Sequence, residues 1–255
     1  MTTPESNRKI KTALANIALS ATFFFISGCA ALVSSTTSRF ADNLSYAFEN
    51  NSDLSVVERG APAYLLMLDA LIQDDPENPS LLRSAARLNS FYAELFIEDL
   101  PEKQSLTDKA LTLSLRAACL DSDALCGIRE MKFEPFQETI DRTGAAHIES
   151  LFTLGSVWAG WIQAHKKDWN AVAEVARVEA IMKRVAQLDE TFEDGGAFLY
   201  LGVISSLAPQ ALGGQPETGR AYFEKAVELS GEKNLYAKVL FAKNYARLVF
   251  DRELH

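Results

Sequence analysis

Apolar residues recur every three or four positions through most of the chain, which is the spacing of amphipathic helices. Polar stretches rich in Pro or Gly interrupt this spacing, and no run of alternating apolar and polar residues predicts a strand. The pattern predicts a short helix through Phe40, Leu44 and Phe48, a helix from Ser55 to Ile72, and helices at 80–96, 105–120, 123–132, 145–165, 168–189, 196–208, 217–229 and 234–250. Because the pattern predicts helices and no strands, the predicted fold class is all-α. The short connections favour antiparallel neighbouring helices.

Three helix–turn–helix pairs share one layout, at 68–82, 180–202 and 221–242. In each pair an apolar-faced helix ends in a polar turn, and a second helix then opens with small and large apolar residues. The third pair is the clearest copy and resembles a tetratricopeptide repeat. We therefore expect antiparallel helix pairs in a degenerate tetratricopeptide-like array, with an irregular helical bundle as the alternative.

The first 28 residues have a different composition from the rest. Three basic residues within positions 8–11 precede a nearly uncharged run at 12–25, as in an export signal. The run is short for a membrane span, which takes about 20 apolar residues. The tetrapeptide Ile-Ser-Gly-Cys at 26–29 follows and resembles the bacterial lipobox. A plain signal anchor with a coincidental cysteine is the alternative.

The lipobox resemblance implies that Cys29 is lipidated and that residues 1–28 are removed as a lipoprotein signal peptide. Residues 29–52 would then form a lipidated tether with a short helix, and residues 53–255 a tetratricopeptide-like helical domain. Ala30 stands where an Asp commonly retains lipoproteins at the inner membrane. The implied location is therefore the inner leaflet of the outer membrane, facing the periplasm.

The predicted mature chain carries a net negative charge. The formal net charge is −9, and removal of three basic residues and one acidic residue with the signal changes it to −11. No dense run of Lys or Arg follows the N-terminus, which argues against nucleic acid as a partner. Such a surface would repel anionic lipid headgroups, so we expect membrane contact through the lipid anchor.

Two cysteines, Cys119 and Cys126, remain in a compartment that permits disulfides. On a continuous helix their Cα atoms would lie roughly 10 Å apart, beyond bridging distance. The Asp-Ser-Asp step at 121–123 is a good helix breaker, however. Either a disulfide across that junction or two buried thiols fits the sequence, and neither reading requires a metal.

Residues that could carry out catalysis do not form a recognisable motif. The three histidines, His147, His165 and His255, lie in no metal-binding helical motif and beside no plausible nucleophile. Phosphate-binding and dinucleotide-binding loops are also missing from the sequence. We therefore predict a protein that is not an enzyme and needs no cofactor or metal.

One segment, residues 151–162, is apolar on nearly all sides and contains two Trp and two Gly residues. A helix of this kind is either a central core helix or the lining of a groove. In the second case the side chains expected to line an apolar ligand cavity are Phe152, Trp158, Trp161 and Tyr200. The core reading is the simpler of the two.

Several of these features together resemble the TatT family, the tetratricopeptide-like T component associated with tripartite ATP-independent periplasmic (TRAP) transporters. They are the lipobox, a helical domain of this size, degenerate repeats, the Trp-containing helix, and the Gly-Gly-Gln-Pro turn at 213–216 before the last repeat. A Gly-Arg step expected within 110–118 is absent from this chain.

The resemblance implies a non-enzymatic accessory lipoprotein. Such a protein assembles as a homotrimer, docks the periplasmic solute-binding protein of a TRAP transporter and offers a cavity for a hydrophobic small molecule. A general envelope scaffold whose repeat surface binds proteins is one alternative. An enzyme acting on peptidoglycan through an isolated carboxylate is the other, and it would require a polar cleft with a Glu of raised pKa.

Overall fold

The computed structural model describes residues 39–41, 43–48 and 50–250, and every regular element in that part of the chain is a helix. Residues 39–41 and 43–48 are helical. The α-helices that follow are α2 (Leu54–Asp74), α3 (Pro79–Phe96), α4 (Leu100–Asp121), α5 (Phe133–Arg142), α6 (Ile148–Ala164), α7 (Trp169–Ala173), α8 (Val175–Leu188), α9 (Gly196–Ser205), α10 (Pro216–Leu229), α11 (Leu235–Leu240) and α12 (Arg247–Val249). Residues Phe241–Ala246 form a π-helix between α11 and α12.

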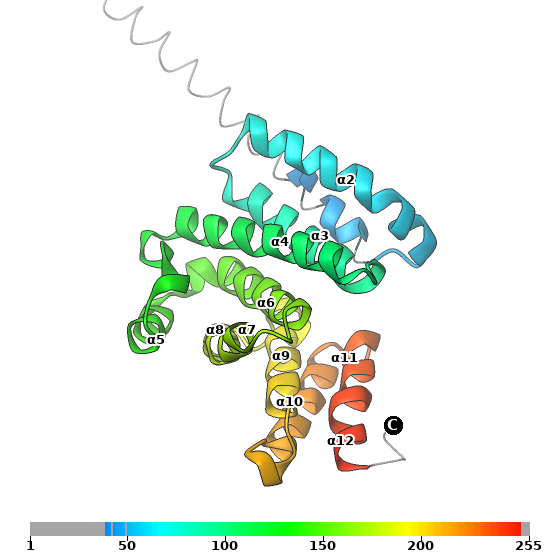
Figure 1. Cartoon of the computed structure of the whole chain (residues 1–255), viewed down its shortest axis with the longest axis vertical. Coiled ribbons are helices and arrows are strands. Elements are labelled where there is room, and N and C mark those ends of the chain that lie inside the picture. The colour runs from blue at the N-terminus through cyan, green and yellow to red at the C-terminus, as the bar shows by residue number, and fades with distance from the viewer. Residues whose placement is uncertain (1–38, 42, 49, 251–255) are drawn as a thin grey trace, which may run out of the picture.

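The helices pack on one another mostly in chain order. Helix α3 lies beside α4, α4 beside α6, α6 beside α8, α8 beside α9 and α9 beside α10. Helices α2–α4 therefore occupy one end of the molecule and α10–α12 the other, with α6 and α8 between them (Figure 1). A second contact, between α3 and α6, brings the N-terminal helices against the centre.

Three apolar clusters form the core. The largest is central and is built on α6, whose buried residues contact side chains from α4, α5, α8 and α9. A second lies between the N-terminal helix at 39–48, α2, α3 and α4. The third is C-terminal and centres on Phe223 of α10.

A glycine allows close packing of two helices in the central cluster. A Cβ at Gly155 of α6 would lie 2.7 Å from the Cε atom of Met182 and 2.9 Å from Cγ2 of Ile181, both on α8. These distances are shorter than van der Waals contact. Helices α6 and α8 can therefore approach this closely only because position 155 carries no side chain.

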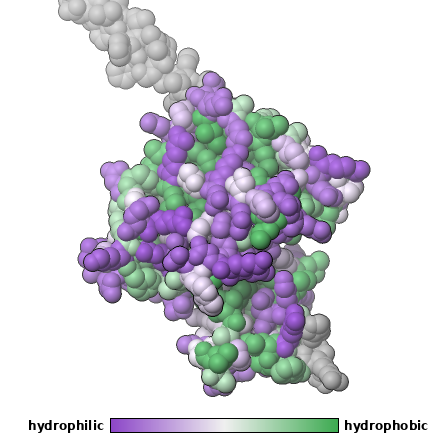
Figure 2. Space-filling view, viewed as in Figure 1, coloured by the Kyte–Doolittle hydropathy of each residue, from purple (hydrophilic) through white to green (hydrophobic). Residues whose placement is uncertain are grey.

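The apolar residues that remain exposed are numerous near the C-terminus. On the face shown in Figure 2, polar residues cover much of the N-terminal half, and apolar residues are prominent over the C-terminal helices. Large exposed apolar side chains in this region include Leu207, Leu212, Leu235, Val239 and Phe250.

The all-α prediction is confirmed, but several local predictions were wrong. Helix α2 is capped by Asp53, whose carboxylate accepts from the amides of Ser55 and Val56, and not by the predicted Ser55. The helix predicted at 123–132 is two short 3₁₀ turns separated by Gly127, which has a φ of 64° that favours glycine. Helix α5 was not predicted at all.

Two long predicted helices are divided in the structure. The helix at 145–165 begins with a 3₁₀ turn, Ala145–His147, before α6. The helix at 168–189 breaks at Glu174 into α7 and α8. The segment predicted as one helix at 234–250 is α-helical at Leu235–Leu240, π-helical at Phe241–Ala246 and α-helical again at Arg247–Val249.

The three predicted repeat pairs correspond to α2 with α3, α8 with α9, and α10 with α11. Helices α4 to α7 stand between the first and second pairs, so the pairs do not follow one another without interruption. The tetratricopeptide-like arrangement therefore stays a prediction. Within the described residues, no helix has the length and apolar character required to cross a membrane. The predicted signal peptide and Cys29 lie outside those residues.

Candidate functional site

Two of the four predicted cavity residues, Phe152 and Tyr200, meet in an aromatic cluster. The ring of Phe152 on α6 lies edge-to-face with the ring of Phe192, at 5.6 Å between centroids, and with that of Tyr200 on α9, at 6.1 Å. We call these three residues the Phe152 cluster. Phe152 is buried, whereas Phe192 and Tyr200 are half-buried, so the cluster extends from the core toward the surface.

Helix α9 reaches the Phe152 cluster because its first residue is glycine. A Cβ at Gly196 would lie 2.9 Å from Cζ of Phe152, so any larger residue would push the ring away. Farther along the same region, Phe198 of α9 contacts Tyr222 of α10 with ring centroids 6.0 Å apart. Both are half-buried, and they form a second aromatic contact, between α9 and α10.

Two ion pairs from α3 lie beside this aromatic surface. The guanidinium of Arg87 donates to the carboxylate of Glu193 at 2.7 Å, and that of Arg83 donates to Glu149 at 2.8 Å. Arg83 and Arg87 are one helical turn apart, so both point from the same face of α3. Their acceptors differ in context: Glu149 is in the first turn of α6, whereas Glu193 is in the loop between α8 and α9.

The loop between α8 and α9 starts with a tight polar turn. The carboxylate of Asp189 accepts from the amide of Thr191 at 2.9 Å and from its hydroxyl at 2.7 Å. These hydrogen bonds, the one from the hydroxyl first, hold the pKa of Asp189 below its usual value.

The other two predicted cavity residues, Trp158 and Trp161, lie in a separate polar setting. Trp158 is fully buried, and its indole N–H donates to Glu174 at 2.6 Å. The indole N–H of Trp161 donates to Asp108 of α4 at 2.7 Å. Both tryptophans therefore have their polar atoms satisfied by carboxylates, as packed core residues require.

Arg129 contacts the rings of both tryptophans. Its guanidinium lies 4.2 Å from the ring centre of Trp161 and 5.8 Å from that of Trp158, and it forms an ion pair with Glu174 at 3.2 Å. Cation–π contact and the ion pair together fix the 3₁₀ turn at 128–130 on α6. Phe136 closes the other side of Trp158, edge-to-face at 6.2 Å.

All four predicted residues lie in or pack against the central apolar cluster, but their direct contacts divide them into two groups. Phe152 and Tyr200 belong to the aromatic surface between α6 and α9, and Trp158 and Trp161 belong to a hydrogen-bonded part of the core. Sequence reasoning did not find Arg87, Arg129, Glu174 or Glu193, because each acts through a partner far away in the chain. No local motif indicates such a partner.

The Phe152 cluster combines two kinds of surface. Aromatic faces supply an apolar contact surface, and the adjacent ion pairs supply a polar edge. A model of the TRAP transporter T-component family matches residues 50–255. The chain belongs to this family. A search of curated proteins finds no match to the chain.

A T component is an accessory part of a transporter. The matched region begins at residue 50 and includes every helix from α2 to α12. It therefore includes both the Phe152 cluster and the tryptophans. Cys29 lies before the matched region.

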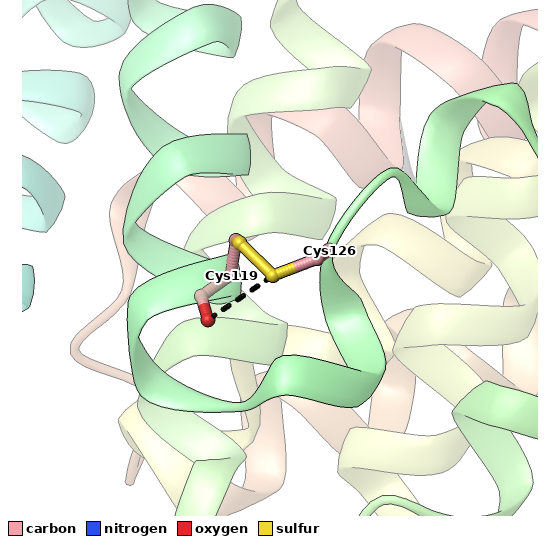
Figure 3. The surroundings of a disulfide bond; sticks show 2 residues. All are labelled: Cys119 and Cys126. Atoms are coloured by element: carbon pink, nitrogen blue, oxygen red, sulfur yellow. Dashed lines mark hydrogen bonds between the residues drawn. A yellow bond between two sulfur atoms is a disulfide. The ribbon is translucent and has the colours of Figure 1, made fainter.

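In this T component, Cys119 and Cys126 are joined by a disulfide (Figure 3). Helix α4 ends at Asp121 and the chain reverses into the 3₁₀ turn Asp123–Leu125, which brings the two Cα atoms to 4.3 Å. The sulfur of Cys126 also lies 3.5 Å from the carbonyl oxygen of Cys119. An oxidised sulfur has no proton to donate, so this is a packing contact.

Proposed function

We propose that this chain is a lipid-anchored T component that faces the periplasm, docks the solute-binding protein of its TRAP system and offers that protein an apolar ligand cavity. Membership of the T-component family across residues 50–255 is the observation that carries the proposal. Phe192 and Tyr200, which are half-buried and border Phe152, support the ligand role, because small-molecule sites are lined predominantly by hydrophobic and aromatic side chains.

The ligand role belongs to the Phe152 cluster and not to the tryptophans. Trp158 and Trp161 already use their indole N–H groups on carboxylates, and Trp158 has no exposed surface. A ligand at Phe152 and Tyr200 would meet aromatic faces, with the ion pairs of α3 at its edge. A hydrophobic small molecule with one polar end fits this surface.

The docking role is tested by affinity capture of the acylated protein from detergent-solubilised envelopes, followed by mass spectrometry. We expect recovery of a periplasmic solute-binding protein of the TRAP class, and direct binding of the two purified proteins. Recovery of envelope assembly or cell-wall proteins alone would instead indicate a general scaffold. The homotrimeric state is tested on the same preparation by analytical ultracentrifugation.

The ligand role is tested by mass spectrometry of small molecules extracted from the purified protein. Tyr200→Ala removes one half-buried ring of the Phe152 cluster, and Trp169→Ala removes an exposed ring of α7 that lies outside it. We expect Tyr200→Ala to lower the amount of co-purifying apolar compound and Trp169→Ala to leave it unchanged. Equal amounts in both variants would contradict the assignment.

A further inference from the structure

The loop between α8 and α9 has an unusual backbone. Glu193, Asp194 and Gly195 follow one another with φ values of 49°, 54° and 77°. Only glycine adopts this left-handed region without cost, so two of the three residues are strained. Such a conformation persists only where the surrounding structure holds it in place.

The two ends of this loop are firmly attached. At its start, Asp189 holds Thr191 through two hydrogen bonds. At its end, Gly195 is buried so tightly that a Cβ would lie 2.7 Å from Cδ1 of Leu229 on α10. The residues between these anchors, 192–194, are exposed or half-buried.

The tip of the loop is held by the ion pair between Glu193 and Arg87. This contact joins residues 106 positions apart and reaches from the loop to α3. Both side chains are partly shielded, at 28% exposure for Arg87 and 37% for Glu193. The pair is therefore stronger than a fully solvated one, yet water can still compete for it.

The loop lies over the Phe152 cluster. Phe192, which immediately precedes the strained residues, packs its ring on Phe152. Movement of the tip away from α3 would carry Phe192 off Phe152 and expose the centre of the cluster. A strained backbone lowers the cost of such a movement, because opening releases the strain.

We propose that the Arg87–Glu193 ion pair is a latch that holds residues 192–194 closed as a lid over Phe152 and Tyr200, the other two members of the Phe152 cluster. The proposal rests on the proposed function, in which that cluster receives the apolar ligand. Closing of the latch would retain a bound molecule, and opening would admit or release it.

The chain contains a matched control. Arg83 is one turn before Arg87 on α3 and forms an ion pair of similar length, 2.8 Å against 2.7 Å, but its acceptor Glu149 is in a regular helix. Arg83 also donates to the hydroxyl of Ser150 at 3.3 Å. Arg83→Gln and Arg87→Gln therefore remove the same charge from the same helix face. Only the second removes the contact to the lid.

Hydrogen exchange of the mature full chain tests the latch without any ligand. We expect the amides of residues 190–195 to exchange about fivefold to tenfold faster in Arg87→Gln than in wild type, and at the wild-type rate in Arg83→Gln. The charge exchange Arg87→Glu with Glu193→Arg restores the pair and should restore slow exchange. The same rate in Arg87→Gln and Arg83→Gln would overturn the proposal.

Stopped-flow binding of 1-anilinonaphthalene-8-sulfonate tests the lid. We expect faster association in Arg87→Gln than in Arg83→Gln, and faster association for wild type in 1 M salt, which screens the pair. Faster hydrogen exchange of the loop in Arg87→Gln, together with an unchanged rate of probe association, would overturn the gating role. If the probe binds none of the proteins, the proposed ligand cavity fails, whereas hydrogen exchange still decides whether the latch exists.

Discussion

At the scale of single residues, the aromatic side chains of the core and its edge are of two kinds. One kind has a polar atom that donates a hydrogen bond, and the other has none. Trp158 and Trp161 each donate to a carboxylate, so their positions are fixed by direction as well as by packing. Phe152 and Phe192 have no polar atoms and are placed by ring contact alone. The first kind of contact favours a rigid core, and the second tolerates exchange of one apolar partner for another.

The hydrogen bond of Trp158 gives a direct test of this distinction. Trp158→Phe removes a donor to a charged acceptor and leaves a small void, so we expect a loss of about 2 kcal/mol in the free energy of unfolding. Trp169→Phe changes the same residue type at a site that is 84% exposed and should stay within about 0.5 kcal/mol of wild type. Urea denaturation followed by circular dichroism measures both, and equal stabilities would show that the Glu174 contact contributes nothing.

The turn at Asp189 should make stability depend on pH. Because hydrogen bonds lower its pKa in the folded state, this carboxylate stabilises the fold fully above its usual value of 3.8. That stability is lost as the pH falls through the lower, folded-state pKa. Asp189→Asn keeps an acceptor oxygen but does not titrate.

We therefore expect Asp189→Asn to have a lower Tm than wild type at about pH 6, and the difference to shrink at about pH 2.5. Thermal unfolding at the two pH values measures this. A difference that is the same at both values would mean that the turn does not depend on the charge of Asp189.

At the scale of the elements, the sequence predicted helices well and helix ends poorly. Apolar spacing located α3 within one residue at its start, because Asn78 and Pro79 form a clear cap and first turn. It placed the cap of α2 at Ser55, whereas the cap is Asp53 two residues earlier, and both residue types can accept from the free amides. Helix α5 was missed because only Phe136 and Ile140 of its ten residues are buried.

The disulfide stabilises the junction where α4 ends. Its loop is short, with the two cysteines seven positions apart. The chain-entropy relation then gives a loss of about 2.5 kcal/mol in unfolding free energy for Cys119→Ser with Cys126→Ser. Wild type treated with a reductant should match this variant in urea denaturation, and a reductant without effect on wild type would show that the bond is not formed in solution.

At the scale of the whole molecule, the candidate site depends on contacts that no local pattern encodes. Residues 151–162 were predicted to form either a core helix or part of a cavity lining, but the pattern could not show that Phe152 and Trp158 meet different neighbours. Which face meets α9 and which meets α4 depends on the order in which the helices pack. Arg87 and Glu193 illustrate the limit most clearly, because 106 positions separate them.

Attachment to the membrane must come from Cys29 if the proposed location is correct. The predicted mature chain is acidic and would be repelled by anionic lipid, so its helices give no attraction of their own. One acyl chain binds a membrane only marginally, whereas the two or three chains of a lipoprotein hold it stably. The affinity of the protein for the membrane should therefore depend entirely on the lipidated side chain of Cys29.

We expect Cys29→Ser to abolish incorporation of radiolabelled palmitate and to remove the mature form from washed outer membranes. The purified helical domain should keep its wild-type circular dichroism and Tm, because the matched family region begins only at residue 50. Ala30→Asp should leave acylation intact but move the protein to the inner membrane, with Ala30→Ser as the control. Palmitate incorporation that persists in Cys29→Ser would refute the lipobox, and a Cys29→Ser protein that stays on the membrane without palmitate would show that the protein surface itself binds there.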